Sequence, residues 1–258
     1  MRIGVQIQPQ HAAYADIRRA AAAVEEAGAD VLFNWDHFFP LTGDPDGAHF
    51  ECWTVLAAWA EATSRVEIGA LVTCNTYRNP ELLADMVRTV DHISAREGGT
   101  GRLVLGIGSG WFERDYSEYG YDFGTAGGRL DDLAAALPRI EARLGRLNPA
   151  PTRHVPVLIG GGGERKTLRI VARHADIWHG FGDVDTIARK HAVLDDWCAR
   201  LERDPAEIER STDVAGDPAE GEALHAVGTR LFTISVDGPR YDLGRVREWI
   251  AWRDEKNA

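Results

Sequence analysis

The sequence contains little cysteine, and its few cysteines are scattered. Cys52, Cys74 and Cys198 are three in 258 residues. An odd number at wide spacing argues against a disulfide framework, and no histidine pair has the spacing of a zinc-binding helix. We therefore expect no metal site and a cytoplasmic setting, where thiols stay reduced.

Positive charge and long apolar runs are also scarce. The formal net charge is −11 and the sequence pI is about 5.3. This balance argues against nucleic acid and anionic membrane surfaces as partners. No apolar run approaches the roughly 18 residues that a membrane-spanning helix needs. The opening residues, MRIGVQIQPQ, lack the basic start and apolar centre of a secretion signal.

A glycine-rich turn between two apolar runs is the most distinctive stretch that the sequence does contain. Val157–Ile159 has strand character, Gly160–Gly163 follow, and a helical face that includes Leu168 comes next. Glycines let the backbone approach a ligand, and a helix start supplies unpaired N–H groups. The pattern therefore indicates an anion site, to which Arg165 and Lys166 could add charge. A tight turn without a ligand is the alternative, because neither a P-loop nor a complete G-x-G-x-x-G motif is present.

Short apolar strands alternate with amphipathic helices along the chain. The sequence predicts strands at 3–7, 31–34, 66–73, 102–107, 157–159, 175–178, 209–214 and 230–236. It predicts helices at 14–27, 52–62, 80–93, after the glycines, and at 130–144, 186–203, 219–227 and 243–254. Alternation of this kind implies a parallel sheet, and eight units fit one α/β domain over residues 1–258, a single (β/α)8 TIM barrel. A doubly wound open sheet is the alternative, although it would normally carry an early dinucleotide motif.

The active site of such a barrel lies at the carboxyl ends of the strands. The residues there are Gln8, Asp36, His37, Cys74, Gly108, Ser109, Gly110, Trp111, Gly160–Gly163, Trp178 and His179. His37 is the best candidate for a general acid or base, because histidine titrates near neutral pH and the adjacent Asp36 could tune it. The alternative is that both residues only cap backbone groups. Glycines, aromatic rings and an anion site together suit a flavin-like cofactor.

These residues resemble the luciferase-like monooxygenase superfamily, in the branch that uses the deazaflavin coenzyme F420. The matching segments follow one another through nearly the whole chain: Trp35–His37, Arg78–Ala84, Thr89–Asp91 with Ser94, Leu105–Trp111, Gly120–Phe123, Ile159–Gly163, Lys166–Leu168 and Ala175–Trp178. The resemblance implies a luciferase-like (β/α)8 barrel and an oxidoreductase that binds F420 or, as the alternative, FMN.

The resemblance also implies which residues surround the cofactor and the substrate. The expected cofactor-binding residues are Leu71, Val72, Cys74, Gly108, Ser109, Gly110, Gly160, Gly161, Gly162 and Gly163. Leu71–Val72 would be a cis peptide behind the ring, and the four later glycines would hold the cofactor phosphate. Asp36 and His37 would be catalytic, with His37 as the acid–base partner of hydride transfer. Gln8, Trp111, Trp178 and His179 would line the substrate pocket.

The chain departs from the sugar-phosphate dehydrogenases of this family in two places. Phe38–Leu41 stands where they carry a tryptophan, and Trp111 stands where they carry a glutamate. We therefore do not expect glucose 6-phosphate as the substrate.

Three functions stay open. The first is F420-dependent hydride transfer with a small organic substrate. The second is an FMN-dependent monooxygenase that uses oxygen and a separate flavin reductase. The third is a flavin-binding barrel without catalysis. Relatives suggest a homodimer, with Trp53 and Trp59 either at its interface or in the core.

Overall fold

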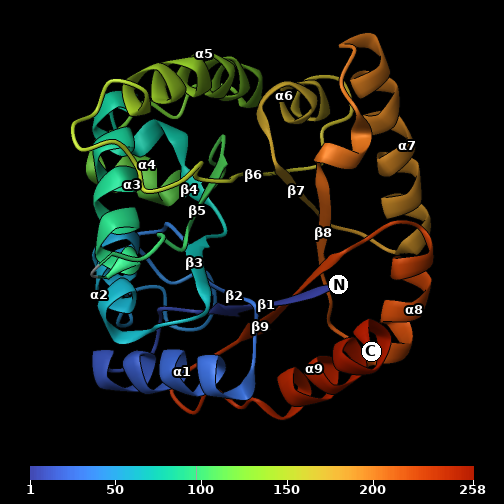
Figure 1. The fold of residues 1–258 in the computed structure, drawn as a ribbon. Coiled ribbons are helices and arrows are strands. Elements are labelled where there is room, and N and C mark those ends of the chain that lie inside the picture. The colour runs from blue at the N-terminus through green and yellow to red at the C-terminus, as the bar shows by residue number, and fades with distance from the viewer. Residues whose placement is uncertain (97) are drawn as a thin grey trace.

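A closed barrel of parallel strands lies inside a ring of helices (Figure 1), in a computed structural model that describes residues 1–96 and 98–258. The strands are β1 (Arg2–Ile7), β2 (Val31–Asn34), β3 (Glu67–Ala70), β4 (Thr73–Cys74), β5 (Leu103–Gly108), β6 (Val157–Gly160), β7 (Ile177–Gly180), β8 (Glu209–Asp213) and β9 (Leu231–Val236). They pair in the order β3-β2-β1-β9-β8-β7-β6-β5-β4, and a further pairing of β3 with β5 closes the sheet. The predicted (β/α)8 TIM barrel is confirmed, and the open sheet is wrong.

Helices connect successive strands on the outside of the barrel. Within the described residues they are α1 (Tyr14–Ala27), α2 (Cys52–Ala62), α3 (Pro80–Ala95), α4 (Glu113–Tyr119), α5 (Ala126–Leu144), α6 (Thr167–His174), α7 (Val184–Arg200), α8 (Pro218–Ala226) and α9 (Gly244–Asn257), with 3-10 turns η1 (Asn75–Tyr77) and η2 (Pro205–Glu207). Asn79 caps α3 by accepting from the N–H groups of Glu81 and Leu82. In this part of the chain, no helix is both long and apolar enough to span a bilayer.

The third predicted strand, 66–73, is interrupted in the structure. β3 and β4 occupy its two parts and both pair with β5, but the register shifts by one residue between them. Gly69 pairs with Val104, whereas Thr73 pairs with Ile107. The extra residue forms a bulge, a feature that commonly re-aims the chain at the rim of a barrel. The cis peptide at Leu71–Val72, which the resemblance implied, lies in this bulge.

The loop that the sequence predicts before residue 130 is largely helical, so this prediction is wrong. It contains α4, and α5 begins at Ala126. Glu113 and Asp115 place negative charge in the first turn of α4, where the helix dipole favours it. Gly120 ends the helix in the left-handed conformation. Seven residues are too few to show the apolar stripe by which longer helices are recognised.

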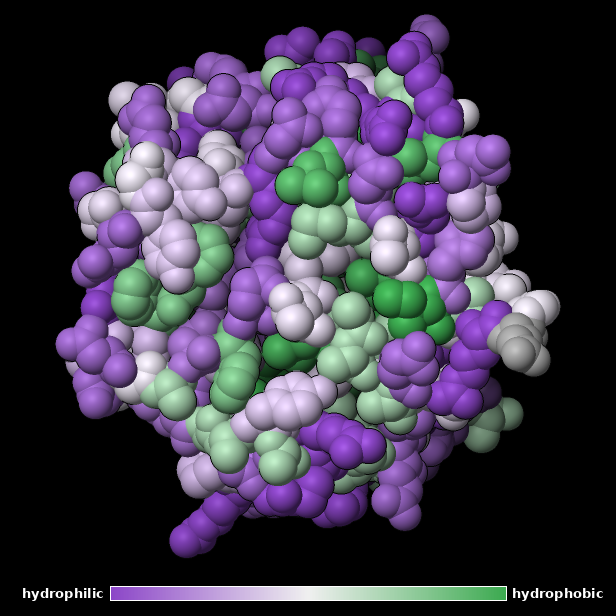
Figure 2. Space-filling model, turned by 90° about the vertical axis from the view of Figure 1, so that its left-hand side faces the viewer, coloured by the Kyte–Doolittle hydropathy of each residue, from purple (hydrophilic) through white to green (hydrophobic). Residues whose placement is uncertain are grey.

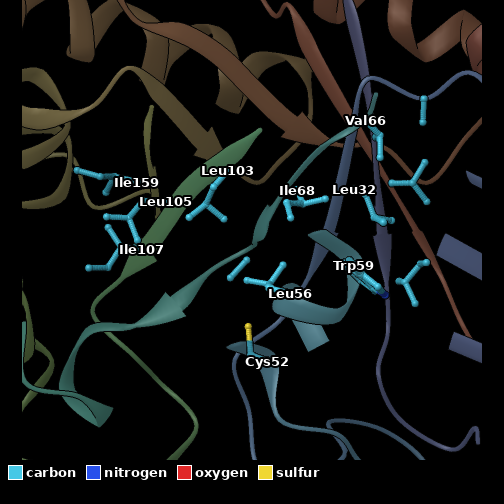
Figure 3. Close-up of a cluster of buried hydrophobic side chains, with 14 of the residues drawn as sticks. Leu32, Cys52, Leu56, Trp59, Val66, Ile68, Leu103, Leu105, Ile107 and Ile159 are labelled. Carbon is cyan, nitrogen blue, oxygen red and sulfur yellow. The ribbon is translucent and has the colours of Figure 1, made fainter. Parts of the chain in front are cut away.

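Alternation along the strands sorts apolar side chains into two layers. The smaller layer fills the barrel and contains Val31, Phe33, Val104, Leu158, Ile177 and Leu231. The larger layer lies between strands and helices, where Leu56 and Trp59 of α2 lie beside Leu32 (Figure 3). Trp53 and Trp59 are both buried: Trp59 has no exposed surface, whereas Trp53 also lines a groove between α2 and α3.

A charged layer closes the barrel at the amino ends of the strands. The Arg2 guanidinium lies 2.6 Å from Glu67 Oε2 and 3.2 Å from Glu209 Oε2, and Arg153 bonds to Glu67 at 2.7 Å. These ion pairs link β1, β3 and β8. The open end of the barrel is therefore the opposite one, at the carboxyl ends of the strands.

Candidate active site

A cavity of about 270 Å³ lies at the carboxyl ends of the strands. Its walls come from β2, the bulge, β4, η1, β5, β6 and β7, and are formed by Asp36, His37, Leu71, Val72, Cys74, Tyr77, Gly108, Ser109, Gly110, Trp111, Gly160, Gly161, His179 and Phe181. Most of the residues predicted for the site thus meet around one cavity. A larger cavity of about 390 Å³ between α5 and β6 contains none of them.

His37 is held by a carboxylate that the sequence analysis did not find. Its Nδ1 lies 2.7 Å from Oδ2 of Asp115, a residue of α4 with no exposed surface. Asp115 also accepts from the Tyr77 hydroxyl at 2.8 Å and from the Phe38 N–H at 3.0 Å. An ionised carboxylate only accepts, so Nδ1 of His37 carries a proton and Nε2 is the nitrogen left for the cavity.

Asp36 does not contact His37, so the expectation that it tunes this histidine is wrong. The Asp36 carboxylate accepts hydrogen bonds from both terminal nitrogens of Arg78, and the distance from Nη2 to Oδ1 is 2.9 Å. It accepts a third hydrogen bond from the Cys74 N–H, at 2.9 Å. Successive residues of an extended chain point to opposite sides, which separates the two neighbours. Burial raises the pKa of Asp36, and the Arg78 guanidinium opposes that shift. Asp36 thus ties β2 to β4 and to the start of α3.

Glycines at and after the ends of β5 and β6 form one wall of the cavity. Gly108 and Gly160 leave room for Val72, since a Cβ on them would lie 2.7 and 3.0 Å from its methyl groups. Gly110 has a φ of 81°, and a Cβ there would collide with the Tyr116 hydroxyl. Burial raises the pKa of Cys74, whose thiol lies 3.1 Å from the same hydroxyl. These glycines therefore allow Val72 and Tyr116 to pack closely against the backbone beside the cavity.

The glycine loop after β6 offers fewer free N–H groups than the sequence suggested. Gly160 belongs to β6, and the N–H of Gly161 donates to His179. Among the described residues, the N–H groups of Gly162 and Gly163 have no acceptor, and Lys190 Nζ lies 2.6 Å from the Gly162 carbonyl. An anionic tail fits at these two amides.

The helix after the glycine loop begins later than predicted. α6 starts at Thr167, so Arg165 and Lys166 lie in a turn before it rather than in its first turn. Lys166 points away from the loop glycines to Asp131, 2.8 Å from its Oδ1. The cation beside the glycines is therefore Lys190 of α7, which the sequence analysis did not single out.

Two residues predicted for the substrate pocket lie elsewhere. Trp178 points outward from β7 to the helical layer, where its ring packs on His191 at a centroid distance of 5.4 Å. The next residue, His179, points inward instead, because side chains alternate along a strand. Gln8 accepts a bond from Gln10 at 3.3 Å and does not line the cavity. The predictions for Trp178 and Gln8 are wrong.

His179 is a neutral, buried histidine in the wall of the cavity. Its Nδ1 lies 2.9 Å from Ser211 Oγ, and its Nε2 has no hydrogen-bond partner. Burial lowers its pKa to about 3. His179 therefore presents a polar atom but no positive charge to a ligand.

The sequence matches a known family over most of its length. Residues 1–216 of the 258 match the profile described as luciferase-like monooxygenase. The chain belongs to this family. The resemblance drawn from the sequence motifs is confirmed.

Curated relatives match parts of the chain. An uncharacterised protein of Mycobacterium tuberculosis (strain ATCC 25618 / H37Rv) is 28% identical over 159 residues, 54% of this chain and 55% of that protein. The match thus spans about half the length of this relative. An F420-dependent glucose-6-phosphate dehydrogenase of Amycolatopsis mediterranei is 33% identical over 113 residues, 43% of this chain and 32% of that protein.

Solved structures resemble the chain over its full length. An F420-dependent secondary alcohol dehydrogenase, in complex with an F420–acetone adduct, has a TM-score of 0.83 at 16% identity and covers 97% of this chain and 98% of its own. A monooxygenase from Streptomyces bottropensis has a TM-score of 0.71 at 15% identity, with coverage of 99% and 98%. At these identities the likeness establishes the fold.

Proposed function

We propose that the protein is an oxidoreductase that uses coenzyme F420 and a small organic substrate. The observation that carries the proposal is the pairing of His37 with buried Asp115 at the edge of a glycine-lined cavity. The F420-dependent relative and the F420-dependent structural neighbour support the choice of cofactor.

The residues that would hold the cofactor lie on two sides of the cavity. Leu71, Val72, Gly108 and Gly110 would back its ring, and the N–H groups of Gly162 and Gly163 would hold its phosphate beside Lys190. When bound, F420 supplies a ring that donates or accepts a hydride.

His37 would move the proton that accompanies the redox change. Asp115 keeps a proton on Nδ1, so Nε2 exchanges its proton with the substrate at the cavity edge. The rings of Trp111 and Phe112 lie edge-on to the imidazole, at 5.7 and 5.4 Å, and restrict its rotation. The histidine is thus fixed in orientation before a substrate arrives.

Replacing His37 tests this role directly. We expect His37→Ala to lower turnover by roughly 10²-fold or more, while the binding free energy of F420 changes by less than about 1 kcal/mol. His154→Ala is the matched control, because His154 is exposed and far from the cavity. Turnover of the His37 variant at the wild-type rate would exclude His37 as the acid–base residue.

FMN in a two-component monooxygenase is the second candidate. The full-length likeness to the Streptomyces bottropensis monooxygenase favours it, and a separate flavin reductase would then be the partner. Calorimetric titration of the purified protein with F420 and with FMN separates the two. Tight binding of F420 alone supports the first candidate, and tight binding of FMN alone supports the second. If neither binds, the cofactor proposal fails, and binding without turnover of any substrate would indicate a flavin-binding barrel.

The proposal includes a homodimer in the cytoplasm. A groove between α2 and α3 is lined by apolar residues that include Trp53, Met86 and Leu82, with Glu51 and Asp85 also in its lining, and Leu82 is 54% exposed. Figure 2 views the side of the molecule on which these helices lie and shows apolar residues gathered there. A second copy of the chain would cover this groove. Three free, buried cysteines agree with a reducing compartment.

A further inference from the structure

Two aromatic side chains stand exposed at the rim of the active-site cavity. Trp111 follows β5 and is 63% exposed, and Phe181 follows β7 and is 57% exposed. Both line the cavity, although they come from different strand ends. Large exposed apolar side chains that gather at a pocket commonly mark a binding surface. The rim is therefore apolar and aromatic on two sides.

Each of these rings is paired with a histidine of the cavity. Trp111 lies edge-on to His37 at a centroid distance of 5.7 Å, and Phe181 lies edge-on to His179 at 4.8 Å. His179 leaves Nε2 without a partner, and His37 leaves Nε2 for the cavity. A ligand at this rim would thus meet two aromatic side chains and two polar nitrogen atoms.

The cavity offers no positive side chain to an anionic substrate. Among the described residues that line it there is no lysine or arginine. Lys190 and Lys166 lie at the glycine loop and already contact Gly162 and Asp131. His179 stays uncharged because burial lowers its pKa to about 3. A phosphate or carboxylate on the substrate would find no counter-ion in this lining.

The size of the cavity also places the substrate at the rim. Its volume of about 270 Å³ is at the low end for a site that holds one drug-sized ligand. A cofactor ring against the glycine wall would occupy most of that space. The substrate then lies above it, where Trp111 and Phe181 stand.

We propose that the substrate is an uncharged, planar aromatic compound with a hydroxyl or carbonyl oxygen, held between Trp111 and Phe181. This inference rests on the proposed function, because the cofactor ring forms the floor on which the substrate lies. The oxygen atom meets Nε2 of His37, and the flat ring meets the two aromatic faces.

Three probes with one carbon skeleton test the proposal on F420-saturated protein. They are 2-naphthol, its saturated analogue decahydro-2-naphthol, and 2-naphthyl phosphate, and calorimetry gives their dissociation constants. We expect 2-naphthol to bind at least about tenfold more tightly than the other two, because only it is both flat and uncharged. Equal or tighter binding of either of the other probes overturns the proposal.

Variants locate the bound probe. Trp111→Ala and Phe181→Ala should each raise the dissociation constant of 2-naphthol by about threefold to tenfold, because each variant loses one aromatic contact. Urea unfolding of both variants should match the wild type, which shows that they remain folded. Tyr14→Ala is the control, because Tyr14 is an exposed aromatic residue of α1 that does not line the cavity. Unchanged 2-naphthol binding in both aromatic variants overturns the proposal.

The same titrations distinguish the two ways in which the inference can fail. If F420 binds and 2-naphthol does not, the substrate class is wrong and the proposed function stands. If neither F420 nor FMN binds, the proposed function fails and this inference fails with it.

Discussion

The Asp115 carboxylate has no exposed surface and accepts three hydrogen bonds. The donors are Nδ1 of His37, the Tyr77 hydroxyl and the Phe38 N–H, so both oxygens are used. A buried charge is tolerated when hydrogen bonds replace its water. Burial and the nearby Asp115 raise the pKa of Tyr77, which therefore stays protonated and keeps donating. The orientation of His37 thus depends on this carboxylate.

Removing the charge of Asp115 tests that dependence. We expect Asp115→Asn to lower turnover by roughly 10²-fold with little change in F420 affinity, since an amide no longer fixes the proton on Nδ1 of His37. Steady-state kinetics and calorimetry measure the two quantities. Glu113→Gln, an exposed acid in the same turn of α4, is the control and should be neutral. Equal turnover in the two variants would contradict the assignment.

His179 makes stability depend on pH in a defined window. Its pKa falls from 6.5 to about 3 in the folded protein because it is buried. Between these values the unfolded chain binds a proton that the folded chain does not, so stability falls as pH drops from 6.5 towards 3. In the wild type, this proton lowers the free energy of unfolding by up to about 1.4 kcal/mol for each pH unit below 6.5. We expect His179→Gln to abolish that contribution.

Urea unfolding between pH 7 and pH 5 measures the effect. His154→Gln is the control, because His154 is exposed and should leave the slope unchanged. If the wild type and the His179 variant have the same pH dependence, His179 is not held uncharged in the folded protein.

At the scale of elements, α4 completes the site. Its first turn supplies Asp115 to His37, and Tyr116 packs under Gly110. The same Tyr116 hydroxyl lies 2.6 Å from Thr76 Oγ1, which ties the helix to η1. A short helix between β5 and α5 thus positions groups on two other segments.

Substitutions at Gly110 and Gly120 distinguish the cost of backbone strain from the cost of crowding near α4. Both have positive φ, 81° and 71°, but a Cβ on Gly110 would collide with Tyr116, whereas one on Gly120 would meet open space. We expect Gly120→Ala to cost about 1 kcal/mol of unfolding free energy for strain alone. Gly110→Ala should cost roughly 1–3 kcal/mol more for overpacking. Urea unfolding compares them, and equal losses would show that Tyr116 moves aside freely.

The sequence predicted what depends on local pattern. The alternation of strands and helices follows from residue type and spacing, and the structure confirms it. The segment of α4 carries too few apolar residues to be recognised. The contact of Asp115 with His37 joins residues 78 positions apart, and no local pattern encodes it.

Errors in strand ends had the largest effect on the predicted site. β7 extends to Gly180, two residues beyond its predicted end, so Trp178 lies inside the strand instead of at its end. Because side chains alternate, Trp178 faces the helices and His179 faces the cavity. Phe181, which follows the true end, was missed for the same reason.

At the scale of the whole molecule, the barrel joins the two ends of the chain. β1 pairs with β9 along its full length, and the amino group of Met1 lies 2.9 Å from Asn257 Oδ1. The Arg2 ion pairs with Glu67 and Glu209 add links across the amino ends of three strands. We propose on these grounds that residues 1–258 form one domain.

The apolar groove between α2 and α3 leads us to predict that two copies of the chain form a dimer through it. We expect the wild type to sediment as a dimer and Leu82→Glu to sediment as a monomer, because a charge in the covered groove would lose its water. Analytical ultracentrifugation at micromolar concentration measures this. Tyr14→Glu, at an exposed aromatic residue of α1, is the control and should remain dimeric. A monomeric wild type would contradict the prediction.

The bond between His37 and Asp115 also sets an order of events during folding. His37 follows β2, and Asp115 follows β5, the strand that pairs with β3 to close the sheet. Contacts among β1, α1, β2 and α2, which carries Trp53 and Trp59, can bury core residues while the histidine still rotates freely. In a refolding experiment, recovery of tryptophan fluorescence should therefore precede recovery of turnover, and the delay between them would report when the two segments meet.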